Sequence, residues 1–480
     1  MAYRYGNREQ MTLLPQSIEE YIPEDNPVRV YDAFVEALDF GGLGMELDEE
    51  QVGNPGYDPR AMLKLLVYGY SYGVRSSRKL ERETHYNLSF LWLMGGLKPD
   101  HKTIAEFRRR NKKALKRVLR QCAGMCLKLG LIAGNALFVD GTKVRANAGR
   151  GQIHDQAYYE GLLKEIDGRI EELLEECEAV DEKEEGEGSW VGIDSELRTA
   201  KNLRGKVEEA LKSFEERGRE KVNLTDPDCG LMHGVQGSHA SYNLQEVVDD
   251  KQGLIVHAEA VSESTDVNQF ARQIEQAHEV LGKRSEVACA DAGYADTVEL
   301  EKIDRQGIKV VVPSQRQALH EEEGPFSKSH FRYEKDKDCY VCPAGQRLGY
   351  VGTDRRTEKR HYQISDGMIC RRCEHYGQCT TSKRGRKIIR HPLEELKEKL
   401  EAQYEASAEI YARRKGRVEH PFGHFKRNLQ AHAFLLRGRD GVGAESSLLA
   451  TCFNLARMMT ILGVGQLIEK FREHYAPLLA

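Results

Sequence analysis

Three carboxylates stand in segments where an acidic side chain can bind a divalent metal. Asp140 follows the apolar run ALFV, Asp291 follows VACA, and Glu419 lies among basic residues in RRKGRVEHPFGHFK. Mg²⁺ prefers hard oxygen ligands, and two such ions held by shared carboxylates can clamp the attacking and the leaving oxygen of a phosphodiester. We therefore expect phosphoryl transfer on a nucleic acid.

The segment around Glu419 has the spacing of a helix that presents several functional side chains on one face. Lys426 lies seven residues after Glu419, which is two helical turns, so the ammonium would meet a DNA phosphate while the carboxylate holds metal. Tyr411 and Lys415 precede Glu419 by eight and four residues and lie near the same face. Pro421 is the difficulty, because proline kinks a continuous helix unless it falls in the first turn.

A cluster of cysteines predicts a second kind of metal site. Paired Cys-x₂-Cys units are the usual way to present four thiolates tetrahedrally to Zn²⁺. Two such pairs, separated by 27 residues and followed by a fifth cysteine, involve Cys339, Cys342, Cys370, Cys373 and Cys379. His375 and the fifth cysteine compete for a place among the ligands, so the spacing leaves the set of four open.

The charge distribution favours a DNA-binding protein more than the net charge of −5 does. Residues 165–187 hold twelve acidic and two basic residues, so the rest of the chain carries about +5. Residues 101–120 hold nine Lys or Arg against one Glu, and they include Arg108, Arg109 and Arg110. Such a stripe neutralises phosphates and releases counterions. The alternative is an ordinary solvated helix face.

Residues 1–128 read as a helical, DNA-binding domain. Asp58 and Pro59 form a plausible helix start before RAMLKLLVYGY, whose apolar residues recur at spacings of three and four. Thr103 and Glu106 have the spacing of a capping box, so we expect the basic helix to begin there. A compact helical domain with a basic helix is a common DNA-binding arrangement.

The remainder predicts an α/β domain with two insertions. Strand patterns near 137–146, 242–249, 254–260, 285–291 and 308–313 are interrupted by two helical stretches, an order that matches a ribonuclease H-like core. We assign this core to residues 129–313 and 401–480. A helical hairpin with an acidic tip is inserted at 155–220, and the cysteine-rich, zinc-binding insertion occupies 314–400. Asp140 would lie on the first strand and Asp291 at the end of the fourth.

Composition sets outer limits on location. The 480 residues suggest two to four domains. There is no run of about 18 apolar residues, and MAYRYGNREQ lacks the apolar region of a signal peptide. We expect a soluble, cytoplasmic protein that does not enter a membrane.

Several of these segments together resemble the insertion-sequence transposases of the DDE class. The resemblance rests on VDGTKVRANA, NLTDPD, YNLQEVVD, ADAGYAD and residues 411–426, and on YDPRAMLKLLVYGY and PDHKTIAEFRRRN near the start. It implies a ribonuclease H-like fold in which Asp140, Asp291 and Glu419 bind Mg²⁺ or Mn²⁺. It also implies a leading DNA-binding domain, double-stranded DNA partners in the form of element ends and target DNA, and a homo-oligomer assembled on DNA.

The match is imperfect at one position. The family signature places Tyr, then Arg three residues later, Glu four after that and Lys seven further on. Here Arg414 keeps its distance from Tyr411, whereas Lys415 keeps the distance to Glu419. Which residue takes the Arg role is open, and a lysine there would lose bidentate phosphate contact.

The expected activity is therefore cutting and joining of DNA at element ends by two-metal catalysis. One alternative is a catalytically silent DNA-binding protein derived from such an enzyme, against which the presence of all three acids argues. Another is a metal-dependent nuclease without strand transfer, which the same site chemistry would serve.

Overall fold

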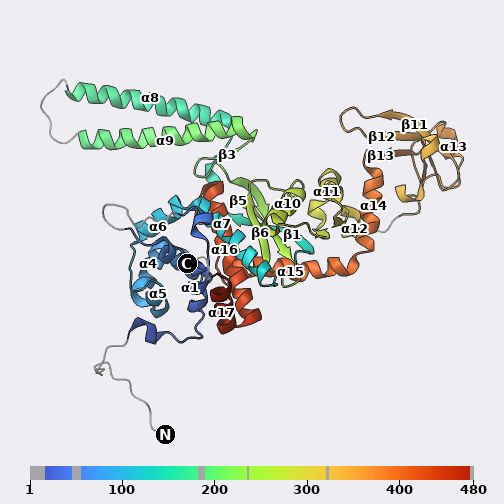
Figure 1. Ribbon diagram of the computed structural model, residues 1–480. Coiled ribbons are helices and arrows are strands. Elements are labelled where there is room, and N and C mark those ends of the chain that lie inside the picture. Colours follow the sequence, from blue (N-terminus) through green and yellow to red (C-terminus); the bar gives the residue numbers. More distant parts are fainter. Residues whose placement is uncertain (1–16, 46–55, 182–189, 235–236, 321–323, 476–480) are drawn as a thin grey trace, which may run out of the picture. The chain divides into compact units, whose positions relative to one another are not determined.

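The computed structural model describes residues 17–45, 56–181, 190–234, 237–320 and 324–475, and it is a mixed α/β protein (Figure 1). The chain divides into two compact units. The first comprises residues 1–266, 273–285 and 414–480, and the second comprises 267–272 and 286–413. The first unit thus includes the predicted helical domain together with part of the predicted core.

The helical part of the first unit surrounds one long buried helix, α16 (Gly438–Leu462), against which α3 and α7 pack. The next helix, α17 (Val464–Tyr475), packs on α1. No single described helix is long and apolar enough to cross a membrane, although α16 and α17 together, bent by 110°, pass that test on length and composition. The helices before the first sheet are α1 (Val28–Glu36), α2 (Phe40–Leu43), α3 (Pro59–Ser71), α4 (Ser77–Tyr86), α5 (Leu88–Leu93), α6 (His101–Arg110) and α7 (Lys112–Lys128).

Two predicted helix starts can be compared with the structure. Asp58 caps α3, as expected, by accepting a hydrogen bond of 2.8 Å from the backbone N–H of Arg60. Helix α6 starts within the predicted run 99–103, but the capping role of Thr103 was wrong, because Asp100, three residues earlier, caps the helix by accepting from the N–H of Thr103 at 2.8 Å. An N-cap carboxylate satisfies the same free donor that a capping box would. Glu106 is released for other contacts.

The sheet of the first unit contains the predicted strands β1 (Ala136–Arg145), β5 (Gly237–Asp249) and β6 (Ile255–Val261), and β5 pairs antiparallel with both β1 and β6. Strand β4 (Gly230–Gly234) pairs antiparallel with the first part of β5, residues 237–241. In the β1–β5 ladder Asp140 lies directly opposite Glu246. Residues opposite each other in a ladder point to the same face of the sheet, so these two acids share a face.

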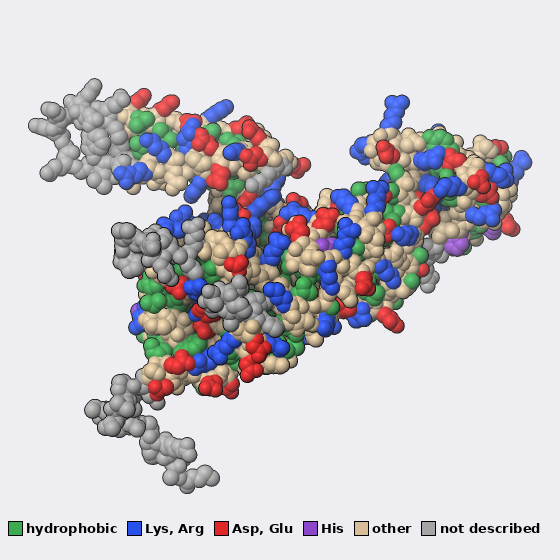
Figure 2. Space-filling view, in the orientation of Figure 1, with side chains coloured by type: hydrophobic (Ala, Val, Ile, Leu, Met, Phe, Trp, Pro, Cys, Tyr) green, Lys and Arg blue, Asp and Glu red, His purple; other side chains and the backbone are tan. Residues whose placement is uncertain are grey.

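The predicted helical hairpin is present as α8 (Gln156–Asp181) and α9 (Trp190–Arg217), with β2 (Ile153–His154) pairing with β3 (Val222–Asn223) at its base (Figure 1). Its core includes Tyr159, Val207 and Phe214. Ion pairs such as that of Arg169 with Glu196 cross between the helices, and Figure 2 shows acidic and basic side chains interspersed along them. The expected acidic tip, at 182–189, lies outside the described residues.

The second unit combines a parallel strand pair with a separate antiparallel sheet. Strands β7 (Val287–Cys289) and β8 (Lys309–Val311) are parallel and are linked through α11 (Thr297–Asp304), while α14 (Glu394–Glu405) packs on β8. Helix α10 (Phe270–Leu281) precedes β7 in the chain. The five-stranded sheet is formed by β9 (Arg332–Glu334), β10 (Cys339–Val341), β11 (Arg347–Thr353), β12 (Arg360–Ile364) and β13 (Lys387–Arg390), in that spatial order.

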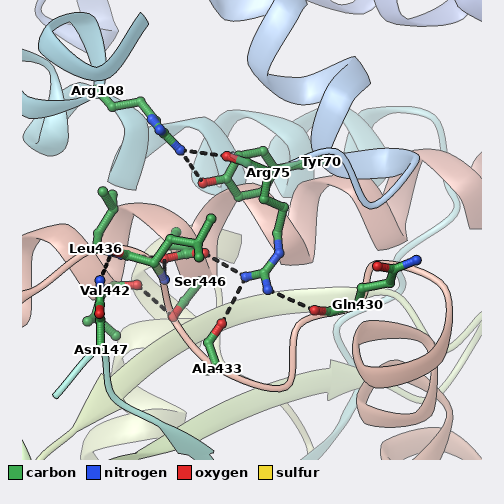
Figure 3. A network of polar contacts seen from close by, with 11 residues as sticks. Tyr70, Arg75, Arg108, Asn147, Gln430, Ala433, Leu436, Val442 and Ser446 are labelled. Atoms are coloured by element: carbon green, nitrogen blue, oxygen red, sulfur yellow. Dashed lines mark hydrogen bonds and ion pairs between the residues drawn. The ribbon is translucent and has the colours of Figure 1, made fainter. Parts of the chain in front are cut away.

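A buried ion pair connects the helical part of the first unit to the segment after α15 (Ala408–Arg427). Glu445 of α16 is fully buried and binds Arg75 at 2.7 Å. The Arg75 guanidinium also donates to the backbone carbonyls of Gln430 and Ala433 (Figure 3). The second oxygen of Glu445 accepts from the N–H groups of Leu435 and Leu436. Both members of the buried ion pair, Arg75 and Glu445, thus bind the backbone of the loop between α15 and α16.

We expect that Glu445→Gln will lower the free energy of unfolding of the first unit by roughly 3–5 kcal/mol, because it leaves the buried Arg75 charge uncompensated. Urea denaturation followed by circular dichroism measures the effect. The control is Asp440→Asn, which removes an ion pair of 3.0 Å to Lys116 whose two side chains are 57% and 41% exposed. Exposed pairs contribute about 1 kcal/mol or less. Equal losses in both variants would contradict the anchoring role.

Candidate active site

Asp140 lies where β1 leaves the core. The preceding Leu137, Phe138 and Val139 are fully buried, whereas the Asp140 side chain is 18% exposed. Its Oδ1 atom accepts a hydrogen bond of 2.9 Å from the N–H of Gly141. A carboxylate placed at the margin of a buried strand is held rigidly by its backbone and still reaches a ligand.

Helix α15 brings one arginine to this carboxylate. Arg414 is buried, and its guanidinium lies 3.0 Å from Asp140 Oδ1. Lys415, the other candidate for the signature Arg position, is exposed. The register of the helix therefore turns Arg414, and not Lys415, toward β1. A guanidinium at this distance supplies positive charge where a metal ion would also be attracted.

A second contact fixes the other end of α15 on the same strand. The Lys426 ammonium donates to the Thr142 hydroxyl at 3.0 Å. Since Asp140 and Thr142 are two residues apart on β1, their side chains point to one face of the sheet. Arg414 and Lys426 therefore mark the path of α15 across the face that carries Asp140.

Glu419 is exposed on α15 between these two contacts. The helix continues through the buried Pro421, so the face shared by Glu419 and Lys426 is preserved. At a rise of about 1.5 Å per residue, Glu419 lies about 7.5 Å along the axis from Arg414. The first unit thus carries two of the predicted acids, one on β1 and one on the helix that crosses it.

Asp291, the third predicted acid, belongs to the second unit. It follows β7 by two residues, and its side chain caps a short 3-10 turn (Ala292–Tyr294) by accepting from the N–H of Gly293 at 2.8 Å. Tyr294 is fully buried and anchors this turn. The carboxyl ends of parallel strands are the usual place for binding and catalytic groups in α/β sheets. Asp291 has such a position.

The last signature residue, Tyr411, lies on the part of α15 that belongs to the second unit. Its ring packs edge-on against Tyr404 of α14, with ring centroids 5.0 Å apart. The side chain is half-buried. Tyr411 therefore helps to join α14 to α15.

Glu246, which sequence reasoning missed, is a fourth acid beside Asp140. It is 1% exposed, and neither carboxyl oxygen has a hydrogen-bond partner. Burial, together with the nearby charge of Asp140, raises the pKa of Glu246 well above its ordinary value. The signal was present in YNLQEVVD, where the glutamate stands directly before two valines near the end of a strand pattern. Unpartnered buried carboxyls are costly and therefore unusual.

The donor chemistry around Asp140 suits a hard cation. Within the described ranges, no three His, Cys, Asp or Glu side chains are already spaced as ligands of one metal ion. Asp140 is nevertheless a partly exposed carboxylate, and the two unpartnered oxygens of Glu246 lie on the neighbouring strand. Oxygen donors of this kind fit Mg²⁺ or Mn²⁺ and do not fit a soft metal.

The predicted basic stripe divides into buried and exposed members. Arg108 is 5% exposed and donates to the Tyr70 hydroxyl at 3.3 Å, to the Arg75 carbonyl at 2.8 Å and to Ser77 (Figure 3). Its guanidinium makes its contacts in the interior of the protein and is not exposed for binding to DNA. Arg109 and Arg110 are about 70% exposed, and both bind Glu106, whose pKa their contacts lower to about 2.

The five predicted cysteine ligands also fall into two groups, according to whether they line a cavity. Cys342, Cys370, Cys373 and Cys379 line one cavity in the second unit, whereas Cys339 does not. All are free thiols in the structure.

Replacing Glu246 with Met, which has a similar shape, should raise the midpoint of thermal unfolding measured in EDTA. The pKa of Glu246 is higher in the folded protein than in the unfolded chain, where it is about 4.3. Ionisation of Glu246 is therefore harder in the folded protein, and its contribution to stability is lost as pH rises above the unfolded value. The gain should therefore be larger at pH 8 than at pH 5. The control is Glu259→Met, which removes a carboxylate that accepts from Gln273 at 3.1 Å. A drop in stability at both pH values would show that Glu246 has a partner.

Two segments of the chain match known protein families. Residues 16–110 match a family described as a transposase domain (DUF772), which covers α1 to α6. Residues 341–459 match a family described as a transposase DDE domain, which includes the four cavity-lining cysteines, Glu419 and Lys426. Neither the curated proteins nor the solved structures contain a match.

The two matches agree with each other and with the motifs around Asp140 and Asp291, which lie between them in the chain. A leading transposase domain followed by a DDE domain is the order that the sequence motifs predict. The two family matches therefore support an insertion-sequence transposase of the DDE class.

Proposed function

We propose that this transposase cuts and joins DNA at the ends of its own insertion sequence, using Asp140, Asp291 and Glu419 as the metal-binding triad. The observation that carries the proposal is the placement of α15 on β1. Arg414 binds Asp140, Lys426 binds Thr142 on the same face of β1, and Glu419 lies between these two residues on α15. A helix with an unrelated role would have no reason to direct two cations to this face.

We further propose that the core is ribonuclease H-like. Supporting this, three antiparallel strands (β1, β5 and β6) are followed along the chain by α10, β7, α11 and β8, with β7 parallel to β8. The proposed triad occupies a strand in the first unit, the end of a strand in the second, and a late helix. Acids on elements far apart in sequence can be adjusted separately to a phosphodiester.

The residues of the chain have separable roles in this proposal. When bound, Mg²⁺ or Mn²⁺ would activate the attacking oxygen and stabilise the leaving oxygen. Arg414 holds Asp140 in place and balances its charge when DNA is absent. Glu419 is exposed, and so it can reach a ligand without rearrangement of the core. Lys426 can exchange its contact with Thr142 for a phosphate oxygen, since a neutral hydroxyl binds an ammonium more weakly than a phosphate does.

The partner is double-stranded DNA, as element ends and as target. Exposed Arg109, Arg110 and Lys415 would contact phosphates, and Tyr411 would contribute its hydroxyl. Arg109 and Arg110 are paired with Glu106 in the structure, so DNA binding would have to compete with that carboxylate. Assembly as a homo-oligomer on paired ends and action in the cytoplasm remain predictions.

We expect native protein with Mg²⁺ or Mn²⁺ to yield cut and joined products on labelled DNA that carries the element's own ends. Asp140→Asn and Asp291→Asn should abolish both, because an amide is a poor ligand for these cations. The control for the latter is Asp296→Asn, since Asp296 also caps a helix start through bonds of 3.0 Å that an amide oxygen can replace. Binding without any product would favour a silent DNA-binding protein, and cutting without joining would favour a nuclease.

The two candidates for the signature Arg position can be separated in the same assay. We expect Arg414→Gln to lower the rate of DNA cleavage by at least about tenfold, which corresponds to loss of one charge-assisted contact of about 1.4 kcal/mol or more. Lys415→Gln should change the rate by roughly threefold or less and should mainly weaken DNA binding in a salt-dependent way. The reverse order would assign the role to Lys415.

A further inference from the structure

The cysteine-rich part of the second unit contains a candidate metal site that is separate from the carboxylates. A cavity of about 40 Å³ is lined by four of the five clustered cysteines, together with apolar groups such as Phe326 and Ile364. Cys342 comes from the turn after β10, Cys370 and Cys373 from α13 (Gly367–Arg371) and the turn that follows it, and Cys379 from the loop before β13. Three chain segments thus direct thiols into one small space.

The backbone around these thiols is arranged for sulfur that carries negative charge. The N–H of Gln346 donates to Cys342 Sγ at 3.2 Å, and the N–H of Arg386 donates to Cys370 Sγ at 3.4 Å. Gln346 lies four residues after Cys342, across a tight turn, and Arg386 lies in a neighbouring loop sixteen residues after Cys370. Backbone N–H groups aimed at sulfur stabilise a thiolate more than a thiol, and thiolates are the form that binds zinc.

A glycine makes room for one of the sulfur atoms. Gly385 has φ = +82°, and a Cβ atom there would lie 3.2 Å from Cys370 Sγ and 2.2 Å from a methyl group of Ile364. Both the backbone conformation and the space exclude a side chain. The loop that contains Gly385 is therefore shaped around the Cys370 sulfur.

The fifth cysteine is directed elsewhere. Cys339 lies on β10, three residues before Cys342, and its sulfur is 4.0 Å from a carboxylate oxygen of Glu334 on β9. It is buried but does not line the cavity. The Cys339 sulfur is thus engaged with Glu334 outside the cavity, and it is not placed to join the four other thiols.

His375, the remaining competitor, also lines the cavity, but its ring has other contacts. The imidazole packs on Phe326 with centroids 4.8 Å apart, and its Nε2 atom lies 3.4 Å from Glu374. Cys379 lines the same cavity as the three other thiols, so it belongs to the group of four.

We propose that Cys342, Cys370, Cys373 and Cys379 bind one structural Zn²⁺ ion, and that Cys339 takes no part. Four thiolates at about 2.3 Å from zinc form a closed tetrahedral site. The thiols face one cavity rather than one point, and within the described part of the chain no three are yet at ligand spacing, so side-chain rotation must complete the shell. The site would fix residues 366–386, which hold no strand, against β12 and β13.

Elemental analysis of the purified full chain tests the proposal. The expected result is one zinc per chain in native protein and in Cys339→Ser, with less than about a quarter of that in Cys370→Ser and Cys379→Ser, because three thiolates bind zinc far more weakly than four. Full zinc in the latter two variants, loss of zinc in Cys339→Ser, or iron or no metal in native protein would overturn it.

A measurement on native protein guards against variants that do not fold. The chain is alkylated with and without a zinc chelator, and modified cysteines are located by mass spectrometry. The chelator should expose Cys342, Cys370, Cys373 and Cys379 together, whereas Cys339 should stay protected by burial in both samples. Equal alkylation of the four thiols with and without chelator would contradict the site. Cobalt replacement should also give the visible spectrum of a tetrahedral four-thiolate centre.

Discussion

The buried carboxylate of Glu445 is the constraint on which the rest of the first unit depends. A fully buried charge is tolerated only when it is paired and hydrogen-bonded. Glu445 meets this condition by binding Arg75 from the helical part and the backbone of Leu435 and Leu436 after α15. Its burial therefore fixes the loop that ends α15, and with it the direction in which Lys426 approaches β1. The N-terminal helices are thus part of the frame of the proposed active site.

The charge balance on β1 follows from this placement. The antiparallel register sets Asp140 opposite Glu246, and α15 brings one guanidinium to the pair. One positive charge cannot neutralise two ionised carboxylates, so Glu246, which is buried and unpartnered, keeps its proton more readily than Asp140 does. Asp140 is the partly exposed acid of the two, and the one that a ligand can reach. A divalent cation attracted to it would compete with Arg414 for the same oxygen.

Local sequence patterns predicted the helices and strands that depend on nearby residues. They did not predict side-chain positions that depend on contacts with residues distant in the sequence. The strand at 136–145, the hairpin helices and the start of α3 follow from periodicity and capping within a few residues. The burial of Arg108 could not be predicted, because three consecutive arginines look alike until Tyr70 and Arg75 pack on one of them. The choice between Arg414 and Lys415 likewise needed the rotation of α15 on β1. Glu246 was missed because its importance comes from the cross-strand residue.

The proposed zinc ion would give the cysteine-rich sheet a source of stability besides its apolar core. Its buried cluster consists of Phe331, Tyr340, Leu348, Tyr362 and Ile388, which is few side chains for five strands. Small domains with little apolar surface generally depend on metal ions or disulfides. Cys342 and Cys379 pack against this cluster, so a zinc ion bound there would extend the core into the loop that has no strands. The stability of the insertion would then depend on metal supply, independently of the carboxylates that act on DNA.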